Sequence, residues 1–244
     1  MTVRTYVVFT AIMIGLICLA PNAHAGLGDF LNTIEKTLAG DGVSESKVIQ
    51  GLKQALEIGT DNAVKVVSKT GGYQDNPKIR IPLPAAVVKV EGILRTAGLG
   101  SQLDAFEKSM NRAAEQAAPH ARSLFWDAVK AMSFDDAKRI LKGRENEATL
   151  YFEDKTRGQL MELFRPLVHN TMSEVGVTRY YQALKTKLQS RLFINTLYVD
   201  LDQYVTGRAL DGLFLMIAEE ERKIREDPAA RATELLKDVF GKAR

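Results

Sequence analysis

Apolar residues recur every three or four positions along almost the whole chain. Residues 26–40, 177–191 and 201–221 show this spacing clearly. The period places one apolar face along each segment, which predicts amphipathic α-helices. Because no internal repeat and no long linker divides the chain, the pattern predicts an all-α fold. We expect a single multi-helix domain over residues 26–244, with about eight to ten helices.

Prolines, glycines and capping residues predict where these helices break. The glycine pair at 71–72 should end a helix, and Pro119 should interrupt another, because its ring clashes with the carbonyl four residues earlier. Ser133 with Asp136 three positions later resembles a capping box, with Asp in place of the usual Glu. Pro166 is expected to kink a later helix.

One short extended, proline-rich segment, at about residues 71–84, departs from the helical pattern. Its prolines bias the residues before them toward extended backbone. Apolar residues alternate there with basic residues and a proline: Lys78, Ile79, Arg80, Ile81, Pro82 and Leu83. The segment is therefore an extended arm or a short edge strand. It is either a linker that packs its apolar side on the helices or a binding lip at the edge of a cavity.

The first 25 residues have the pattern of a secretory signal peptide. Arg4 precedes an uncharged apolar run over residues 6–20, Pro21 ends the run, and Ala-His-Ala at 23–25 fits a signal peptidase site. The run is too short to span a membrane, and no stop-transfer charges follow it. We expect cleavage after Ala25 and, in a Gram-negative bacterium, a periplasmic product. An uncleaved membrane anchor is the alternative.

Composition narrows the functions of the processed chain. The single cysteine, Cys18, would leave with the signal peptide, so no disulfide framework and no thiolate chemistry are expected. Removing Arg4 from the 33 basic residues leaves 32 against 30 acidic residues. So small a surplus does not indicate a nucleic-acid partner. No later apolar run has the length of a bilayer span, so no transmembrane segment is expected in the mature chain.

The sequence lacks the motifs of common catalytic and nucleotide-binding sites. It contains no H-E-x-x-H, no G-x-S-x-G, no P-loop and no dinucleotide-binding glycine pattern. After processing, the histidines His120 and His169 lie about fifty residues apart, and no cysteine accompanies them. We therefore expect no metal and no cofactor, and the catalytic residues are unknown. The acidic run at 219–221 is interpreted as a solvated face that pairs along its helix with Lys223 and Arg225.

Polar residues within an alanine-rich stretch are the first candidates for a binding site. Helical spacing places Asn111 and Glu115 one turn apart on one side of residues 110–117, with Arg112 beside Glu115. Small residues such as Ala114 form the other side and allow a neighbouring helix to approach closely. Two interpretations stay open: a packed helix whose polar side chains bond a neighbour, or a polar ligand site.

Asp211 is a further binding candidate. It lies between Leu210 and Gly212, at the margin of an apolar stripe. An ion pair with Arg208, three positions earlier on the predicted helix, is sufficient to explain its presence there. Contact with a ligand is the alternative.

A set of aromatic residues lies in the middle of the chain. They are Phe125, Trp126, Tyr151, Phe152, Phe164, Tyr180 and Tyr181. At helical spacing such residues usually form a core, but in a secreted helical protein they can also line a cavity for a lipid or another hydrophobe. The sequence leaves open whether the core is filled or hollow.

Five stretches of the sequence resemble a bacterial family known only as domain of unknown function 4197. They are MNRAAEQA (110–117), DAKRILKG (136–143), ATLYFEDKT (148–156), DLDQYV (200–205) and the long stretch at 209–241. The last is the most specific, and the resemblance extends over nearly the whole mature chain. It implies a signal sequence and a helical body. Since the family has no established activity, the resemblance implies no catalytic residues.

Three functions are compatible with these observations. The favoured one is a non-catalytic module of the cell envelope that interacts with an envelope protein or binds a hydrophobic small molecule. The second is a hydrolase or lyase that uses carboxylates in a cleft and acts on an unidentified substrate. The third is an assembly factor that lies on a membrane surface through residues 26–40, although the balanced charges of that helix give it little attraction to anionic lipid.

Overall fold

The computed structural model describes residues 45–174, 176–192 and 199–226. Its elements are α2 (Glu45–Val67), α3 (Ala85–Val88), α4 (Glu91–Thr96), α5 (Gly100–Ala117), the 3-10 helix η1 (Ala118–Ala121), α6 (Arg122–Ala131), α7 (Phe134–Lys142), α8 (Glu147–Glu174), α9 (Val177–Leu192) and α10 (Leu201–Glu226). With nine α-helices and no β-strand in the described ranges, the predicted all-α fold is confirmed. The expected signal peptide, its cleavage site and the helix expected at 26–40 lie outside these ranges.

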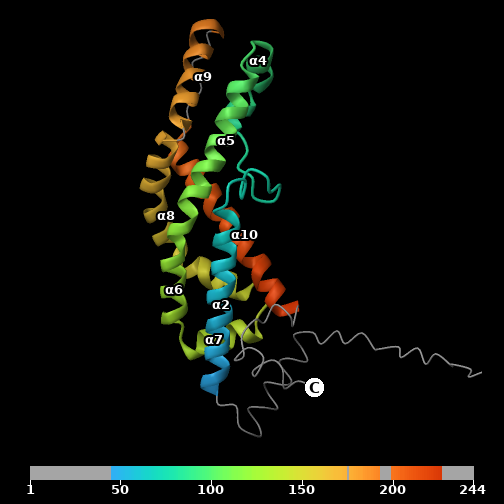
Figure 1. Ribbon diagram of the computed structural model, residues 1–244, viewed down its shortest axis with the longest axis vertical. Helices are drawn as coiled ribbons and strands as arrows, with labels where there is room; N and C mark the ends of the chain where they lie inside the picture. Colours follow the sequence, from blue (N-terminus) through green and yellow to red (C-terminus); the bar gives the residue numbers. More distant parts are fainter. Residues whose placement is uncertain (1–44, 175, 193–198, 227–244) are drawn as a thin grey trace, which may run out of the picture.

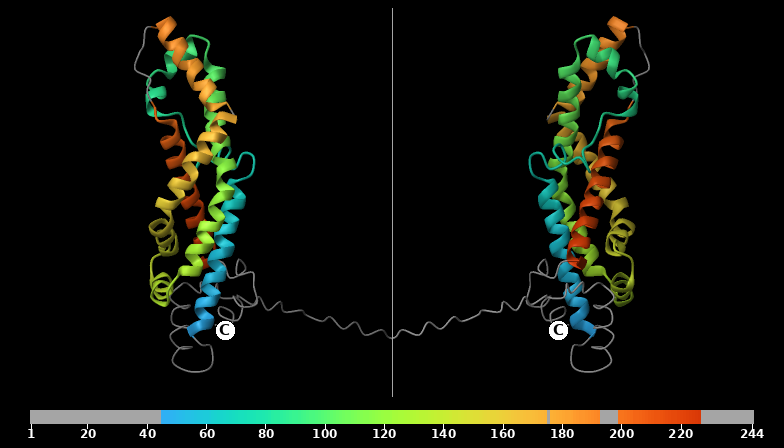
Figure 2. Two further views of the ribbon diagram at one scale, coloured as in Figure 1. Left: turned by 90° about the vertical axis from the view of Figure 1, so that its left-hand side faces the viewer. Right: turned by 90° about the vertical axis from the view of Figure 1, so that its right-hand side faces the viewer.

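The long helices lie alongside one another and give the molecule an elongated shape (Figure 1). α10 packs against α8 and α2, whereas α5 packs against α8 and α9. α4 and the distal part of α9 lie at one end of the molecule, and α7 lies near the other (Figures 1 and 2). The contact between α2 and α10 joins the first and last described helices and closes the bundle.

Several helix boundaries fall where the sequence predicts them. α5 ends before Pro119, which lies in η1, because proline lacks the N–H that a continuing α-helix requires. At the start of α7, the Ser133 hydroxyl accepts the N–H of Asp136, and the Asp136 carboxylate accepts the N–H of Ser133. The predicted capping box is therefore confirmed. Pro166 lies inside α8, which continues past it, and the kink expected there stays a prediction.

Residues 68–84, called the connecting segment below, join α2 to α3 without helix or strand. The segment begins as consecutive turns and continues as extended chain. As predicted, its apolar residues are buried and the residues that alternate with them are exposed: Ile79, Ile81 and Leu83 against Lys78, Arg80 and Pro82. The buried residues belong to the main core, which supports the interpretation as a packed linker. The edge-strand alternative is wrong for these residues.

Aromatic side chains form much of the core in the middle of the bundle. The ring of Phe125 makes edge-to-face contacts with Phe152 and Phe214, with centroids 5.7 and 6.0 Å apart. Such contacts add to the free energy gained by burying the rings. Of the seven aromatic residues considered in the sequence, Trp126 and Tyr180 are only half-buried, and the other five are buried.

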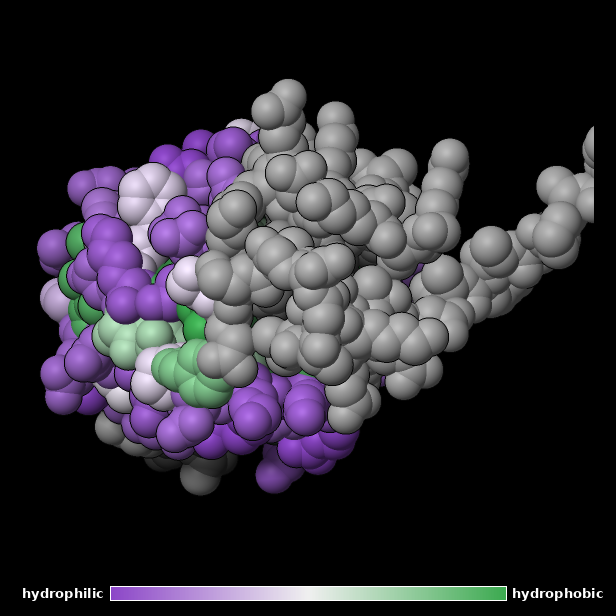
Figure 3. Space-filling model, turned by 90° about the horizontal axis from the view of Figure 1, so that it is seen from below, coloured by the Kyte–Doolittle hydropathy of each residue, from purple (hydrophilic) through white to green (hydrophobic). Residues whose placement is uncertain are grey.

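Hydrophilic residues dominate the described surface in the view from below (Figure 3). The large apolar residues that are exposed lie on five different helices: Val66, Val88, Ile93, Phe134 and Leu215. Single exposed apolar residues are normal on protein surfaces and do not by themselves indicate an interface. None of the helices in the described ranges has both the length and the apolar character needed to cross a membrane.

Candidate functional site

Asn111 lies on α5 with its side chain fully buried. Its Oδ1 accepts the N–H of Ile81 at 2.8 Å, and its Nδ2 donates to the carbonyls of Ile81 and Glu107 at 2.8 and 2.9 Å. The side-chain amide thus pairs with both backbone groups of Ile81, as a neighbouring strand would. If the N–H or the carbonyl of Ile81 were buried without a partner, the fold would lose about 1–3 kcal/mol of stability for each group.

Glu115 lies one turn further along α5, and its side chain is 2% exposed. Its Oε1 accepts the backbone N–H groups of Tyr73 and Gln74 at 3.2 and 3.4 Å, and its Oε2 accepts from Arg112 Nη1 at 3.2 Å. A carboxylate buried this deeply needs such partners, because they replace the hydration it has lost. Glu115 therefore fixes the turn at the start of the connecting segment.

Tyr73 holds the same turn against α10. Its side chain is fully buried, and its hydroxyl donates to the carbonyl of Ala209 at 2.7 Å. Burial, and next the charge of Glu115, raise the pKa of Tyr73 well above its ordinary value, so the phenol keeps the proton that it donates. The ring fits because Gly212 has no side chain: a Cβ there would lie 2.8 Å from the ring and 3.0 Å from the Cβ of Ile79.

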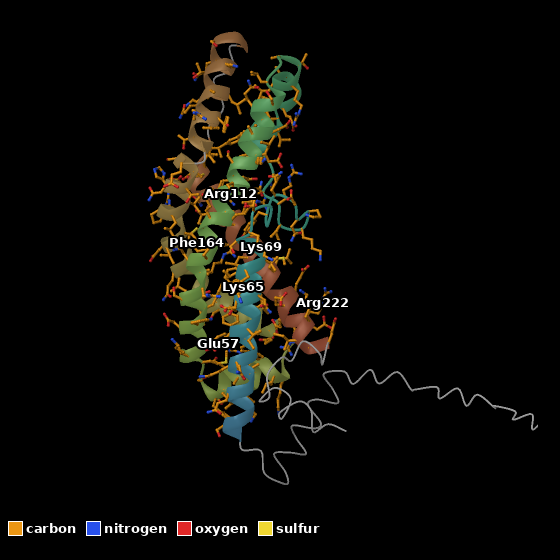
Figure 4. The ribbon with its side chains drawn as sticks, viewed as in Figure 1. Glu57, Lys65, Lys69, Arg112, Phe164 and Arg222 are labelled. Atoms are coloured by element: carbon orange, nitrogen blue, oxygen red, sulfur yellow. The ribbon has the colours of Figure 1, made fainter. Side chains whose placement is uncertain are left out.

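Arg112 covers the carboxylate of Glu115 on the solvent side. Its side chain is 38% exposed, and its Nη1 donates to the hydroxyl of Thr70 at 3.1 Å as well as to Glu115. Lys65 and Lys69 lie in line with Arg112 along the same face of the molecule (Figure 4). A cationic surface therefore lies directly outside the buried hydrogen bonds of Glu115.

Three of the four candidate residues act together on the connecting segment. Asn111 and Glu115 bind its backbone, and Arg112 bridges Glu115 to Thr70. Asn111, Glu115 and Tyr73 are called the segment anchor below. This arrangement supports the interpretation of residues 110–117 as a packed helix whose polar side chains bond a neighbour. Ligand binding by these residues stays a prediction.

Asp211, the fourth candidate, lies on α10 and faces α8. It pairs with Arg157, whose guanidinium also lies 5.7 Å from the ring centroid of Phe214. The ion pair expected from helical spacing, with Arg208, is replaced by this contact between helices, and Arg208 lies instead over the ring of Tyr204. The position of Asp211 is thus explained by packing of α10 on α8. A role in ligand binding stays a prediction.

The acidic run near the end of α10 is not the solvated face that its composition indicates. Glu220 and Glu221 are only 7% and 5% exposed. Glu221 accepts the backbone N–H groups of Ala148 and Thr149, in the first turn of α8, at 3.0 and 2.8 Å. Its predicted ion pair with Arg225 is confirmed. The prediction of exposure fails because α10 packs against both α8 and α2, which bury these carboxylates.

The other polar side chains do not converge on a recognisable centre in the described ranges. His169 Nδ1 lies 3.0 Å from a carboxylate oxygen of Asp202, at a largely exposed position, and His120 is exposed. Among the residues that the structure describes, no three or more of His, Asp and Glu gather so that they could hold a metal ion. Nothing in this part of the chain therefore identifies residues that would hold a metal.

Sequence reasoning missed Thr70, Tyr73 and Glu221. Tyr73 follows two glycines and is a large side chain within the polar turn GGYQDN, which is the signal that could have marked it as an anchor. Glu221 gives no such signal, because it stands in an acidic run that has the composition of a solvated face. Its partners lie 72 and 73 residues away in the sequence.

A family model described as protein of unknown function (DUF4197) matches residues 42–241. The matched range includes every helix from α2 to α10 and the two buried glutamates Glu115 and Glu221, and it agrees with the resemblance seen in the sequence. The comparison with curated proteins found no match, and neither did the comparison with solved structures.

Proposed function

The chain belongs to the DUF4197 family of proteins of unknown function, and we propose that it is a non-catalytic interaction module of the cell envelope. It acts as a helical body that presents its surface, including the connecting segment, to another component of the envelope. The signal-peptide pattern of residues 1–25 supports a periplasmic location after cleavage behind Ala25.

The observation that carries this proposal is that the buried polar side chains of the candidate site form hydrogen bonds within the protein. Both carboxylate oxygens of Glu115 accept hydrogen bonds within the protein, and the amide of Asn111 is committed to the backbone of Ile81. The hydroxyl of Tyr73 donates to Ala209. These side chains therefore hold the fold together, as buried polar groups generally do. A partner would then meet the exposed surface of the described residues rather than these groups.

A carboxylate-based hydrolase or lyase would need a carboxyl group that can reach its substrate. General acid–base catalysis needs a carboxyl group within hydrogen-bond reach of the substrate proton. Glu115 is 2% exposed and lies beneath Arg112, whereas Glu221 is engaged with α8 and Arg225. Both buried glutamates would have to leave their present partners before they could act on a substrate.

A pair of substitutions on α5 tests the proposal. Ala114 is fully buried, so Ala114→Leu should overpack the helix interface and cost about 1–3 kcal/mol. Glu115→Gln keeps an oxygen for the two backbone N–H groups but loses the charge opposite Arg112, so it should cost about 1 kcal/mol. Thermal melts give the stabilities, and complementation of a strain that lacks the gene, scored by detergent sensitivity, gives the function.

In an interaction module, the loss of function in both variants should follow the loss of folded protein and should be relieved at lower growth temperature. In an enzyme that uses Glu115, Glu115→Gln would abolish function while the melt stayed unchanged or rose, since active sites commonly hold groups at some expense to stability. A silent Ala114→Leu together with a stable, inactive Glu115→Gln would refute the proposal.

A further inference from the structure

Four basic residues flank, in the sequence, the hydrogen bond that joins Thr70, just after α2, to Arg112 on α5, and we call them the cationic patch: Lys65, Lys69, Lys108 and Arg112. Lys108 and Arg112 lie one turn apart on α5, so their side chains leave the helix on the same side. Lys65 lies in the last turn of α2, and Lys69 follows it at the start of the connecting segment. The three lysines are exposed, and no ion pair engages their side chains among the described residues. Figure 4 shows Lys65, Lys69 and Arg112 in a row on one face.

The acidic groups around the patch are largely engaged elsewhere. Asp61 binds Arg122 through both carboxylate oxygens, at 2.7 and 2.8 Å. Glu107 binds Arg80 at 2.8 Å, and the carboxylate of Glu115 is buried beneath the surface. The exposed Asp75 of the connecting segment offsets one of the four positive charges. The patch therefore keeps a net positive charge toward solvent.

Arg112 is held in a fixed orientation with one edge of its guanidinium unused. Glu115 and Thr70 both bind Nη1, which leaves Nε and Nη2 without a partner among the described residues. These two nitrogens form the edge that binds two oxygens of a phosphate or carboxylate side by side. The hydroxyl of Thr70 accepts from Arg112, so its own proton is available to donate to an anion beside the guanidinium.

We propose that the cationic patch, with Arg112 and Thr70 at its centre, is a binding site for phosphate groups. Arg112 supplies the oriented fork, and the three exposed lysines supply further positive charge. The shared chemistry can come from a phosphorylated solute or from anionic lipid headgroups. The inference rests on the proposed function, because it names the chemical class of component that such an interaction module would bind.

Calorimetric titration of the full protein with inorganic phosphate and with pyrophosphate tests the site. Pyrophosphate should bind more tightly than phosphate. Arg112→Lys keeps the charge but removes the fork, so it should weaken pyrophosphate binding about tenfold. Lys69→Gln, which leaves the segment anchor untouched, should weaken binding about two- to threefold. Arg222→Gln is the matched control: Arg222 is an exposed arginine on α10, away from the patch (Figure 4), and its loss should change nothing.

Sedimentation with vesicles distinguishes the two sources of phosphate. Binding to phosphatidylglycerol vesicles but not to phosphatidylcholine vesicles, weakened by Arg112→Lys and displaced by pyrophosphate, would assign the site to lipid headgroups. Binding of pyrophosphate with no preference for phosphatidylglycerol would assign it to a phosphorylated solute. No binding of either probe, an unaffected Arg112→Lys, or an equal loss in Arg222→Gln would overturn the proposal. Such a failure leaves the test of the proposed function intact, because that test depends on Glu115, which is buried beneath the patch.

Discussion

Two buried glutamates, Glu115 and Glu221, accept hydrogen bonds from backbone amides in the same way. They differ in how far the arginine beside each carboxylate is exposed to solvent. Each carboxylate accepts two consecutive backbone N–H groups from a distant part of the chain and also binds an arginine on its own helix. Glu115 secures the irregular connecting segment, and Glu221 secures the first turn of α8. We call the pair formed by Glu221 and Arg225 the junction anchor.

The two arginines have different surroundings. Arg225 is 12% exposed and donates to Glu221 through Nε and Nη2, and Nη2 also reaches the carbonyl of Ile140 at the end of α7. Arg112 is 38% exposed and binds Glu115 and Thr70 through a single nitrogen. The junction anchor is thus enclosed within the fold, whereas the segment anchor lies beneath a cation that faces solvent. The same local chemistry is therefore enclosed within the fold at one place and lies beneath an exposed cation at the other.

The largest expected difference in the free energy of unfolding is between two single variants, in which Arg225 or Arg112 is replaced by glutamine. Arg225→Gln should lower the free energy of unfolding by about 3 kcal/mol, because it leaves the buried carboxylate of Glu221 without its counter-charge. Arg112→Gln should lower it by less than about 1 kcal/mol, because water can reach the vacated position. Urea unfolding followed by circular dichroism measures both. Equal costs for the two variants would contradict the distinction between the anchors.

A smaller effect tests how closely the connecting segment fits α10. Gly212→Ala should cost about 1–3 kcal/mol, because the new Cβ would crowd the ring of Tyr73. Gly207→Ala, on the same helix, meets no atom within 4 Å and should be neutral or stabilise the fold by up to about 1 kcal/mol through helix propensity. Thermal melts compare the variants. A Gly212→Ala protein as stable as Gly207→Ala would show that the segment is not seated against α10 in this way.

The smallest expected effect on stability comes from the capping box of α7. There the half-buried carboxylate of Asp136 accepts hydrogen bonds from Ser133. The hydroxyl of Ser133 is the main cause that lowers the pKa of Asp136 below its ordinary value of 3.8. A lowered folded-state pKa stabilises the fold above that ordinary value, and this contribution is lost as the pH falls through the folded-state pKa.

Ser133→Ala should therefore cost about 1 kcal/mol at neutral pH. The difference from the parent protein should shrink in urea titrations repeated at about pH 3, because the carboxyl of the unfolded chain is by then mostly protonated and the stabilisation is lost as the pH falls toward the lowered folded-state pKa. Asp127→Asn, at an exposed position on α6, serves as the control with little expected change at either pH. A difference that stayed constant with pH would rule out the ionised cap as its cause.

Features that depend on neighbours in the sequence could be predicted, and features that depend on distant neighbours could not. The capping box of Ser133 and Asp136 spans three positions, and Pro119 acts on its own turn, so both were visible in the sequence. The alternation of Ile79, Ile81 and Leu83 also predicted which side of the segment is buried. The cap and the helix break depend on adjacent backbone, and the alternation depends on which side chains share one side of an extended chain.

The candidate site shows the limit of such reasoning. The positions of Asn111, Arg112 and Glu115 in an alanine-rich helix indicated hydrogen bonding to a neighbour, but the neighbour could not be named. Glu115 binds Tyr73, 42 residues away, and Tyr73 binds Ala209, 136 residues away. Only the packing of α5 and α10 brings these groups together.

These sequence separations also determine when the connecting segment can find its place during folding. The hydroxyl of Tyr73 has its acceptor on α10, while the N–H of the same residue has its acceptor on α5. Neither bond can form with the native geometry until the loops between these elements have closed, and closing long loops costs chain entropy before any contact compensates it. We therefore expect the helices to associate first and the segment to dock last. In a hydrogen-exchange pulse experiment, the amides of Tyr73 and Ile81 should gain protection later than the amides within α8.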